Sequence, residues 1–109
     1  MIGIRAKNLG LAGFVIDGAV RDADALADCG LPVFARSVTP AGPYKFGPGR
    51  LQLPVAIDGV VVSPGDIVVA DADGVVVVRR DEADQVLADT EKIEAKEAAK
   101  RIAFEGAAV

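Results

Sequence analysis

The strongest constraint on the fold is the stretch PVAIDGVVVSPGDIVVADADGVVVV, residues 54–78. It is dominated by valine and isoleucine, which favour strands, and it contains Asp-Gly twice. An Asp-Gly pair between apolar runs is the strongest short-range signal for a β-hairpin. The stretch therefore predicts two hairpins, one with its turn at Asp58-Gly59 and one that reverses at residues 71–74, separated by a turn at SPGD.

The segments before this stretch alternate between helix and strand. Residues 3–9 are typical of the end of a helix, because the following LGLAG supplies a glycine exit. Residues 14–16 predict a short apolar strand, residues 22–28 a short helix that ends at Cys29-Gly30, and residues 32–35 a second buried strand. Strand, helix and strand at this spacing predict a parallel βαβ step.

A long loop is expected at residues 37–53, since SVTPAGPYKFGPGRLQL contains three prolines and three glycines. Long ordered loops in compact domains are usually functional or lie at interfaces. Residues 81–105 predict one long helix with acidic residues at its start and Gly106 at its end. Its apolar stripe fades after residue 93, so the second half is expected to project or to pack on another subunit. The stripe consists of Ala83, Val86, Leu87, Thr90 and Ile93.

Composition narrows the class of protein. The chain has 109 residues, of which 51% are apolar and 26% charged, so we expect one globular domain. The net charge of −4 and the absence of a basic block argue against direct binding of nucleic acid. No apolar run approaches the ~20 residues that cross a bilayer. The single cysteine, Cys29, excludes an internal disulfide and fits a reducing compartment, so a cytoplasmic location is expected. It is expected to be a small residue near a helix end.

Chemistry must proceed without imidazole, because the chain contains no histidine. This excludes Ser-His-Asp and Cys-His triads and histidine zinc sites. Residues 71–74 lack the remaining ligands of a calcium loop, and the GPYKFGPG segment lacks the residues of a phosphate-binding loop. Lys45 lies in a polar loop, whereas a Schiff-base lysine needs a desolvated setting.

The remaining candidate site is GFVIDGAVRD, residues 13–22, where an apolar strand runs into a turn with charged residues. Arg21 and Asp22 are placed at the carboxyl end of a strand, the edge at which ligands bind in open α/β sheets. Arg21 offers a planar fork for a carboxylate, and Asp22 offers a hard oxygen ligand for a divalent cation. The alternative is a structural Arg–Asp pair that caps the helix.

Several blocks in one order resemble the RraA-like family: GFVIDGAVRD, LPVFAR, TPAGPYK and the stretch of residues 53–78, followed by the closing helix. The family includes the regulators of ribonuclease E activity and the 4-hydroxy-4-methyl-2-oxoglutarate/4-carboxy-4-hydroxy-2-oxoadipate aldolases; older descriptions call members demethylmenaquinone methyltransferases. Methyl transfer is not expected, because no glycine-rich nucleotide-binding turn is present. The resemblance implies that residues 1–109 form one RraA-like domain with an α/β fold of stacked β/β/α layers, similar to a swivelling domain, and a long C-terminal helix. It also implies a homotrimer or a hexamer of two rings, with sites between subunits.

By the same resemblance, Arg21 binds the pyruvate part of a 2-oxo acid and Asp22 anchors a divalent cation, Mg²⁺ or Mn²⁺, largely through water. The implied lyase activities are retro-aldol cleavage to pyruvate and decarboxylation of oxaloacetate, both through an enolate that the metal and Arg21 stabilise. This route needs neither histidine nor lysine.

Two departures from the family pattern bear on this expectation. The glycine-led loop that helps to hold the pyruvate carboxylate in the aldolases would fall before Met1, so the chain is expected to lack the N-terminal part of the family domain. The acidic residue common in the aldolases is replaced by Ala25, and Asp24 lies one place early. Two alternatives therefore stay open: a non-catalytic regulator that binds a basic protein partner, and an oligomerisation module without a ligand.

Overall fold

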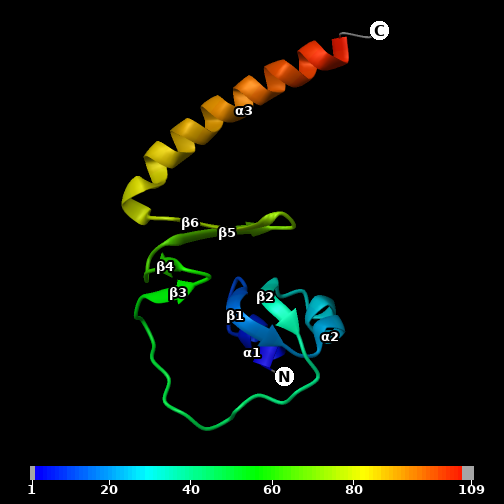
Figure 1. Cartoon of the computed structure of the whole chain (residues 1–109), viewed down its shortest axis with the longest axis vertical. Helices are drawn as coiled ribbons and strands as arrows, with labels where there is room; N and C mark the ends of the chain where they lie inside the picture. The colour runs from blue at the N-terminus through cyan, green and yellow to red at the C-terminus, as the bar shows by residue number, and fades with distance from the viewer. Residues whose placement is uncertain (1, 107–109) are drawn as a thin grey trace. The chain divides into compact units, whose positions relative to one another are not determined.

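The structure is a computed structural model in which residues 2–106 are described, and it consists of two compact units, Met1–Pro64 and Gly65–Val109 (Figure 1). The first unit contains α1 (Ile2–Asn8), β1 (Phe14–Val20), α2 (Ala23–Asp28), β2 (Val33–Val38), β3 (Val55–Ile57) and β4 (Val60–Val62). The second contains β5 (Ile67–Asp71), β6 (Gly74–Val78), the 3₁₀ turn η1 (Arg80–Glu82) and α3 (Ala83–Gly106).

Helix α1 ends as its glycine exit predicts. Gly10 has φ = 81°, its N–H bonds the carbonyl of Lys7 at 2.9 Å, and the N–H of Leu11 bonds the carbonyl of Ala6 at 3.1 Å. This pair of hydrogen bonds is a Schellman motif, which satisfies carbonyls at a helix end through a left-handed glycine. The backbone is thereby turned toward β1.

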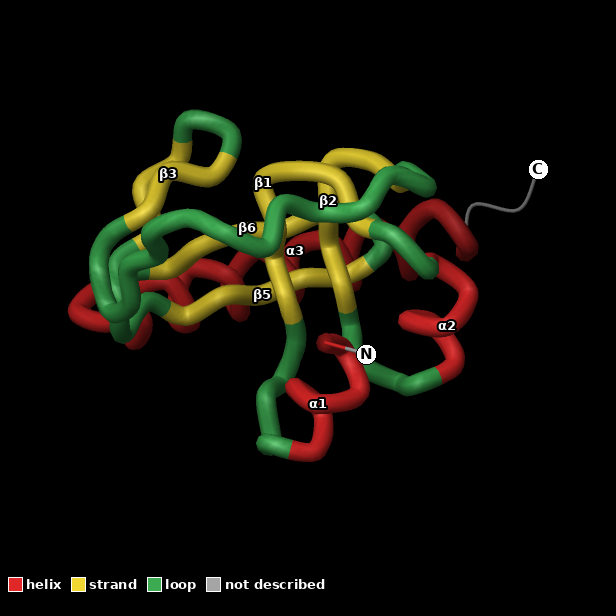
Figure 2. The backbone as a smooth tube through the Cα atoms, turned by 90° about the horizontal axis from the view of Figure 1, so that it is seen from below, coloured by secondary structure: helices red, strands yellow, loops and turns green. Residues whose placement is uncertain are grey.

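The predicted parallel βαβ step is confirmed, because β1 and β2 pair in parallel and α2 connects them along the chain. Figure 2 shows the two strands side by side. Both strands are longer than the sequence indicated: β1 continues from Ile16 to Val20, and β2 continues to Val38. The predicted loop therefore begins later, since residues 37 and 38 belong to β2. The extension of β1 brings its end to the residue immediately before Arg21.

The described residues of the first unit bury a small core where α1 meets α2. Ala6 and Leu31 are buried, as is Gly3. A Cβ added to Gly3 would stand 2.6 Å from Cδ2 of Leu26, so the end of the Leu26 side chain would have to shift to admit it. A Cβ on Gly13 would stand 2.8 Å from the carbonyl oxygen of Pro32, which explains the glycine at the entry to β1.

The two predicted hairpins are confirmed. Strands β3 and β4 pair antiparallel around Asp58 and Gly59, whose φ angles of 49° and 78° are typical of a type I′ turn. In the second unit β5 and β6 pair antiparallel, and Asp73 donates its N–H to Oδ1 of Asp71 at 2.8 Å within the reversal. Asx hydrogen bonds of this kind stabilise turns locally.

The long C-terminal helix is also confirmed, with η1 in place of its expected first turn. None of its described residues is buried, and the stripe residues Val86, Leu87 and Ile93 are exposed. Thr90, predicted on that stripe, donates its hydroxyl to the carbonyl of Val86 at 2.7 Å. Among the helices of residues 2–106, none combines the length and apolar character needed to span a bilayer.

Candidate functional site

The candidate site lies where β1 gives way to α2, and backbone hydrogen bonds fix it on both sides. The N–H of Thr39, just after β2, bonds the carbonyl of Val20 at 2.9 Å. The N–H of Leu26 in α2 bonds the carbonyl of Asp22 at 2.9 Å. Arg21 and Asp22 are therefore presented by a two-residue connection between a paired strand end and a helix start.

Asp22 occupies the left-handed region, with φ = 61° and ψ = 45°, at the N-cap of α2. Few residues other than glycine adopt this region, although aspartate and asparagine tolerate it. An aspartate at an N-cap commonly accepts a hydrogen bond from the first turn, but the Asp22 side chain makes no cap hydrogen bond. The Asp22 side chain therefore does not cap α2, contrary to the alternative of an Arg–Asp pair that caps the helix.

Arg21 and Asp22 lie side by side without a tight ion pair. Nε of Arg21 is 4.0 Å from Oδ2 of Asp22, and the two side chains are 48% and 64% exposed. Exposed pairs at this distance interact weakly. The guanidinium and the carboxylate are therefore both accessible to a ligand that binds beside them.

The long loop returns to this pair. A Cβ added to Gly42 would stand 3.6 Å from Nη1 of Arg21, which is ordinary van der Waals contact. Tyr44 and Phe46 in the same loop are almost fully exposed, and Lys45 is exposed as well. The exposure of Lys45 agrees with the expectation that it is not a desolvated Schiff-base amine.

A divalent cation would meet a sparse donor set here. Within residues 2–106 there is no cluster of three or more His, Cys, Asp or Glu side chains able to hold a metal ion. Asp24 and Ala25 belong to the exposed first turn of α2. Mg²⁺ usually keeps several waters and takes only one or two protein carboxylates. The Asp22 carboxylate makes no cap hydrogen bond. It could therefore hold a cation that keeps most of its coordinated waters, whereas the described residues do not form a site made of protein ligands alone.

A second charged cluster, which includes Asp17 in the middle of β1, was missed at the sequence level. Arg36 of β2 donates from Nε to Oδ1 of Asp17 in β1 and from Nη2 to Oδ1 of Asp58 at 3.2 Å. The N–H of Asp58 is directed at Oδ2 of Asp17 at 3.4 Å. The hydrogen bond from Arg36, with that from the Asp58 backbone, holds the pKa of Asp17 below its ordinary value of 3.8. Asp17 in turn raises the pKa of Arg36 above its ordinary value.

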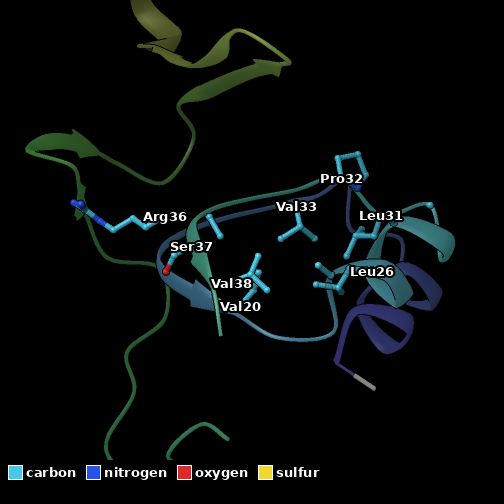
Figure 3. A pocket seen from close by; sticks show the side chains of 12 residues that line it. Val20, Leu26, Leu31, Pro32, Val33, Arg36, Ser37 and Val38 are labelled. Atoms are coloured by element: carbon cyan, nitrogen blue, oxygen red, sulfur yellow. The ribbon is translucent and has the colours of Figure 1, made fainter. Parts of the chain in front are cut away.

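An apolar groove of about 690 Å³ lies beside α2 and β2 (Figure 3). Leu26, Leu31 and Val33 contribute to its walls, and Arg36 extends away from them. Arg21 and Asp22 do not line it, although their neighbours Val20 and Ala23 do. Apolar walls of this kind do not offset the desolvation of a charged ligand.

Cys29 occupies the structural position that was expected. It is the C-cap of α2, it is half-buried, and its Sγ lies 3.2 Å from the carbonyl oxygen of Leu26. Lys7 of α1 donates to its backbone carbonyl. The thiol therefore belongs to the contact between the two helices.

A parallel strand–helix–strand step that presents an arginine and an aspartate at a strand end defines an α/β protein. The family model described as RraA-like, Aldolase/RraA, matches residues 1–77. The chain therefore belongs to the RraA-like family, as its motifs indicated.

Individual relatives support this assignment. A protein of Halalkalibacterium halodurans that bears the provisional name 4-hydroxy-4-methyl-2-oxoglutarate aldolase is 42% identical over 99 residues, which are 91% of this chain and 47% of that protein. A solved structure of an uncharacterised protein from Pseudomonas syringae superposes with a TM-score of 0.82 at 29% identity, over 99% of this chain and 55% of the other.

A second solved structure also resembles the chain. RraAS2 of Streptomyces coelicolor, described as an unusual member of the RNase ES inhibitor RraA family, superposes with a TM-score of 0.80 at 37% identity, over 88% of this chain and 50% of the other. These likenesses confirm the predicted α/β fold. The chain spans about half the length of the relatives it matches.

Proposed function

We propose that this chain carries the arginine–aspartate part of a divalent-metal-dependent lyase site for 2-oxo acids. The reactions are retro-aldol cleavage of 4-hydroxy-4-methyl-2-oxoglutarate-type substrates and decarboxylation of oxaloacetate. The observation that carries the proposal is that Asp22 stands at an N-cap without capping, with its Oδ2 4.0 Å from Nε of Arg21. The provisional aldolase name of a relative 42% identical to the chain supports the same reaction class.

Arg21 is the substrate-binding residue in this proposal. Its guanidinium is permanently charged and presents parallel donors that match a carboxylate bidentately. A 2-oxo acid bound in this way keeps its keto oxygen near a fixed positive charge. Negative charge that develops on that oxygen during the reaction is then stabilised by a group already in place.

Asp22 is the metal residue in this proposal. It is the candidate carboxylate for Mg²⁺ or Mn²⁺ and would hold the cation largely through coordinated water. When bound, such a cation supplies Lewis-acid polarisation of the keto group.

The bond changes are the same in both reactions. In the retro-aldol reaction the C4 hydroxyl gives its proton to water, the C3–C4 bond breaks, and C4 becomes the keto carbon of one pyruvate. The electron pair left on C3 forms the enolate of a second pyruvate. In oxaloacetate the bond to the distal carboxylate breaks, and carbon dioxide leaves. A proton added at C3 then gives pyruvate, so one positively charged pocket for the enolate serves both substrates.

Self-assembly as a homotrimer or a hexamer is part of the proposal. Among residues 2–106 only Ala6 and Leu31 are buried apolar residues, while many large apolar side chains are exposed. Apolar surface of this extent favours association. Light scattering on purified chain would report the mass of the assembly directly, and a monomer at all concentrations would contradict this part.

The test of the reaction is pyruvate release from oxaloacetate with Mg²⁺, with EDTA, and with metal but no protein. Arg21→Lys keeps the charge and removes the bidentate fork, and Asp22→Asn removes the charge in a residue that tolerates the left-handed region. We expect metal-dependent release that falls at least tenfold in each variant. Release that equals the metal background, or that survives both changes, would contradict the proposal.

A second candidate function is inhibition of a ribonuclease by protein binding. It is favoured by the likeness to RraAS2, a member of an RNase ES inhibitor family, and by the exposed aromatic side chains Tyr44 and Phe46. The net charge of −4 suits a basic partner segment. This function predicts partner binding that survives Arg21→Lys and weakens with salt, whereas the lyase predicts loss of pyruvate release.

A further inference from the structure

Strand β1 contains an irregularity opposite Arg36. Ile16 pairs with Ala35, and the next pair is Ala19 with Ser37. Two residues of β1, Asp17 and Gly18, therefore lie opposite the single residue Arg36. This is the arrangement of a β-bulge, which is uncommon between parallel strands and is often found next to active sites.

The bulge decides which residues reach the end of the strand. Because side chains alternate along a strand with a period of two, one extra residue shifts every later position relative to the partner strand. After the bulge, regular pairing resumes through Val20 with Val38, and the N–H of Thr39 bonds the carbonyl of Val20. The placement of Arg21 and Asp22 therefore depends on a bulge three to five residues earlier.

Arg36 holds this bulge from the opposite strand. Its Nε donates to Asp17 in the bulge, and its Nη2 donates to Asp58 at the tip of the β3–β4 turn. The Arg36 side chain is 55% exposed, so the ion pairs contribute little to stability. Their geometric effect is larger, because a planar guanidinium fixes two carboxylates at once.

The geometry points to Arg36 as a positioning residue that acts through Asp17 on the direction in which β1 presents Arg21 and Asp22. Asp58 completes the arrangement, since its side chain accepts from Arg36 and its backbone N–H is directed at Asp17. Arg36 itself does not touch the ligand. The expected effect on ligand binding rests on the proposed function. The expected effect on the backbone of residues 19–22 rests on the bulge alone.

The test compares Arg36→Met and Arg36→Lys with Arg79→Met in the complete chain. Arg79 is the control for loss of an exposed arginine, because its Nη2 lies 3.4 Å from Oδ2 of Asp81 in a local ion pair outside β1 and β2. The first readout is the backbone amide NMR signals of residues 19–22. The second is the affinity for oxalate, a planar mimic of the pyruvate enolate, measured with Mg²⁺.

We expect Arg36→Met to move the amide signals of Arg21 and Asp22 and to weaken oxalate binding about tenfold, as loss of a group that orients a ligand commonly does. Arg36→Lys should recover part of both effects, and Arg79→Met should change neither. Unmoved signals at residues 19–22, or shifts no larger than those in Arg79→Met, would overturn the inference.

The two proposals fail in different ways. If the unchanged chain does not bind oxalate, the proposed function fails, while the amide signals still decide whether Arg36 positions Arg21 and Asp22. If Arg36→Met does not fold, Arg36→Lys and Asp17→Asn provide the same comparison, because each weakens the contact at the bulge by itself.

Discussion

Gly42 comes close enough to Arg21 that a Cβ added to it would stand 3.6 Å from Nη1 of the guanidinium. The long proline- and glycine-rich loop thus passes over the arginine that the proposed site uses. Because residue 42 is a glycine, no side chain at this position separates the guanidinium from a ligand.

A carboxylate at position 42 should therefore compete with substrate. In Gly42→Asp, the new side chain can pair with Arg21, so we expect oxalate affinity and pyruvate release to fall about tenfold or more, as for a charge-assisted contact. Gly42→Ala adds only a methyl group at ordinary contact distance and should leave both unchanged. Equal effects of the two substitutions would contradict a direct interaction with Arg21.

The left-handed conformation of Asp22 predicts different stabilities for different substitutions. Asparagine tolerates this region, whereas alanine in it costs roughly 1–2 kcal/mol. Asp22→Ala should thus lower the free energy of unfolding by about that amount, and Asp22→Asn should change it little. Urea unfolding measures both. If the two variants are equally stable, φ at Asp22 is not the strained value of 61° seen here.

The backbone of Pro32 lies so close to Gly13 that position 13 should not tolerate a side chain. A Cβ there would stand 2.8 Å from the backbone oxygen of Pro32, which cannot move without shifting β2. We expect Gly13→Ala to destabilise the fold by about 1–3 kcal/mol, the usual cost of overpacking. Gly49→Ala is the control, since nothing lies within 4 Å of its added Cβ. The comparison is of urea midpoints, and equal midpoints would refute the predicted clash.

Asp17 should make stability depend on pH at the acid end. Its hydrogen bond from Arg36 lowers its pKa in the folded chain below the ordinary value of 3.8. The stabilisation is therefore fully present above that value and is lost as the pH falls through the lower, folded-state pKa. The difference in Tm between the unchanged chain and Asp17→Asn should be largest near neutral pH and shrink toward zero as the pH falls below 3.8. A difference that stays constant down to acid pH would contradict the assigned cause.

The turns could be predicted from the sequence because their signals are local. Asp58-Gly59 carries its own conformational preference, and the structure has both residues at positive φ. Gly10 likewise marks the end of α1. The placement of Arg21 and Asp22 after a strand could also be predicted, because apolar residues give way to charge at that point.

The length of β1 and its bulge could not be predicted in the same way. Asp17 and Gly18 have the composition of a turn, yet they lie inside the strand, because Arg36 stands 19 residues away in sequence and bonds Asp17 from β2. No local pattern encodes such a long-range contact. The same applies to the contact of Asp58 with Arg36, which joins two elements separated by the long loop.

The central claim is that Arg21 and Asp22 together bind a metal-chelated 2-oxo acid, and calorimetric titration with oxalate tests it most directly. We expect saturable binding that requires Mg²⁺, is abolished by EDTA, and weakens at least tenfold in both Arg21→Lys and Asp22→Asn. Absence of saturable binding to the unchanged chain, or undiminished affinity in both variants, would contradict it.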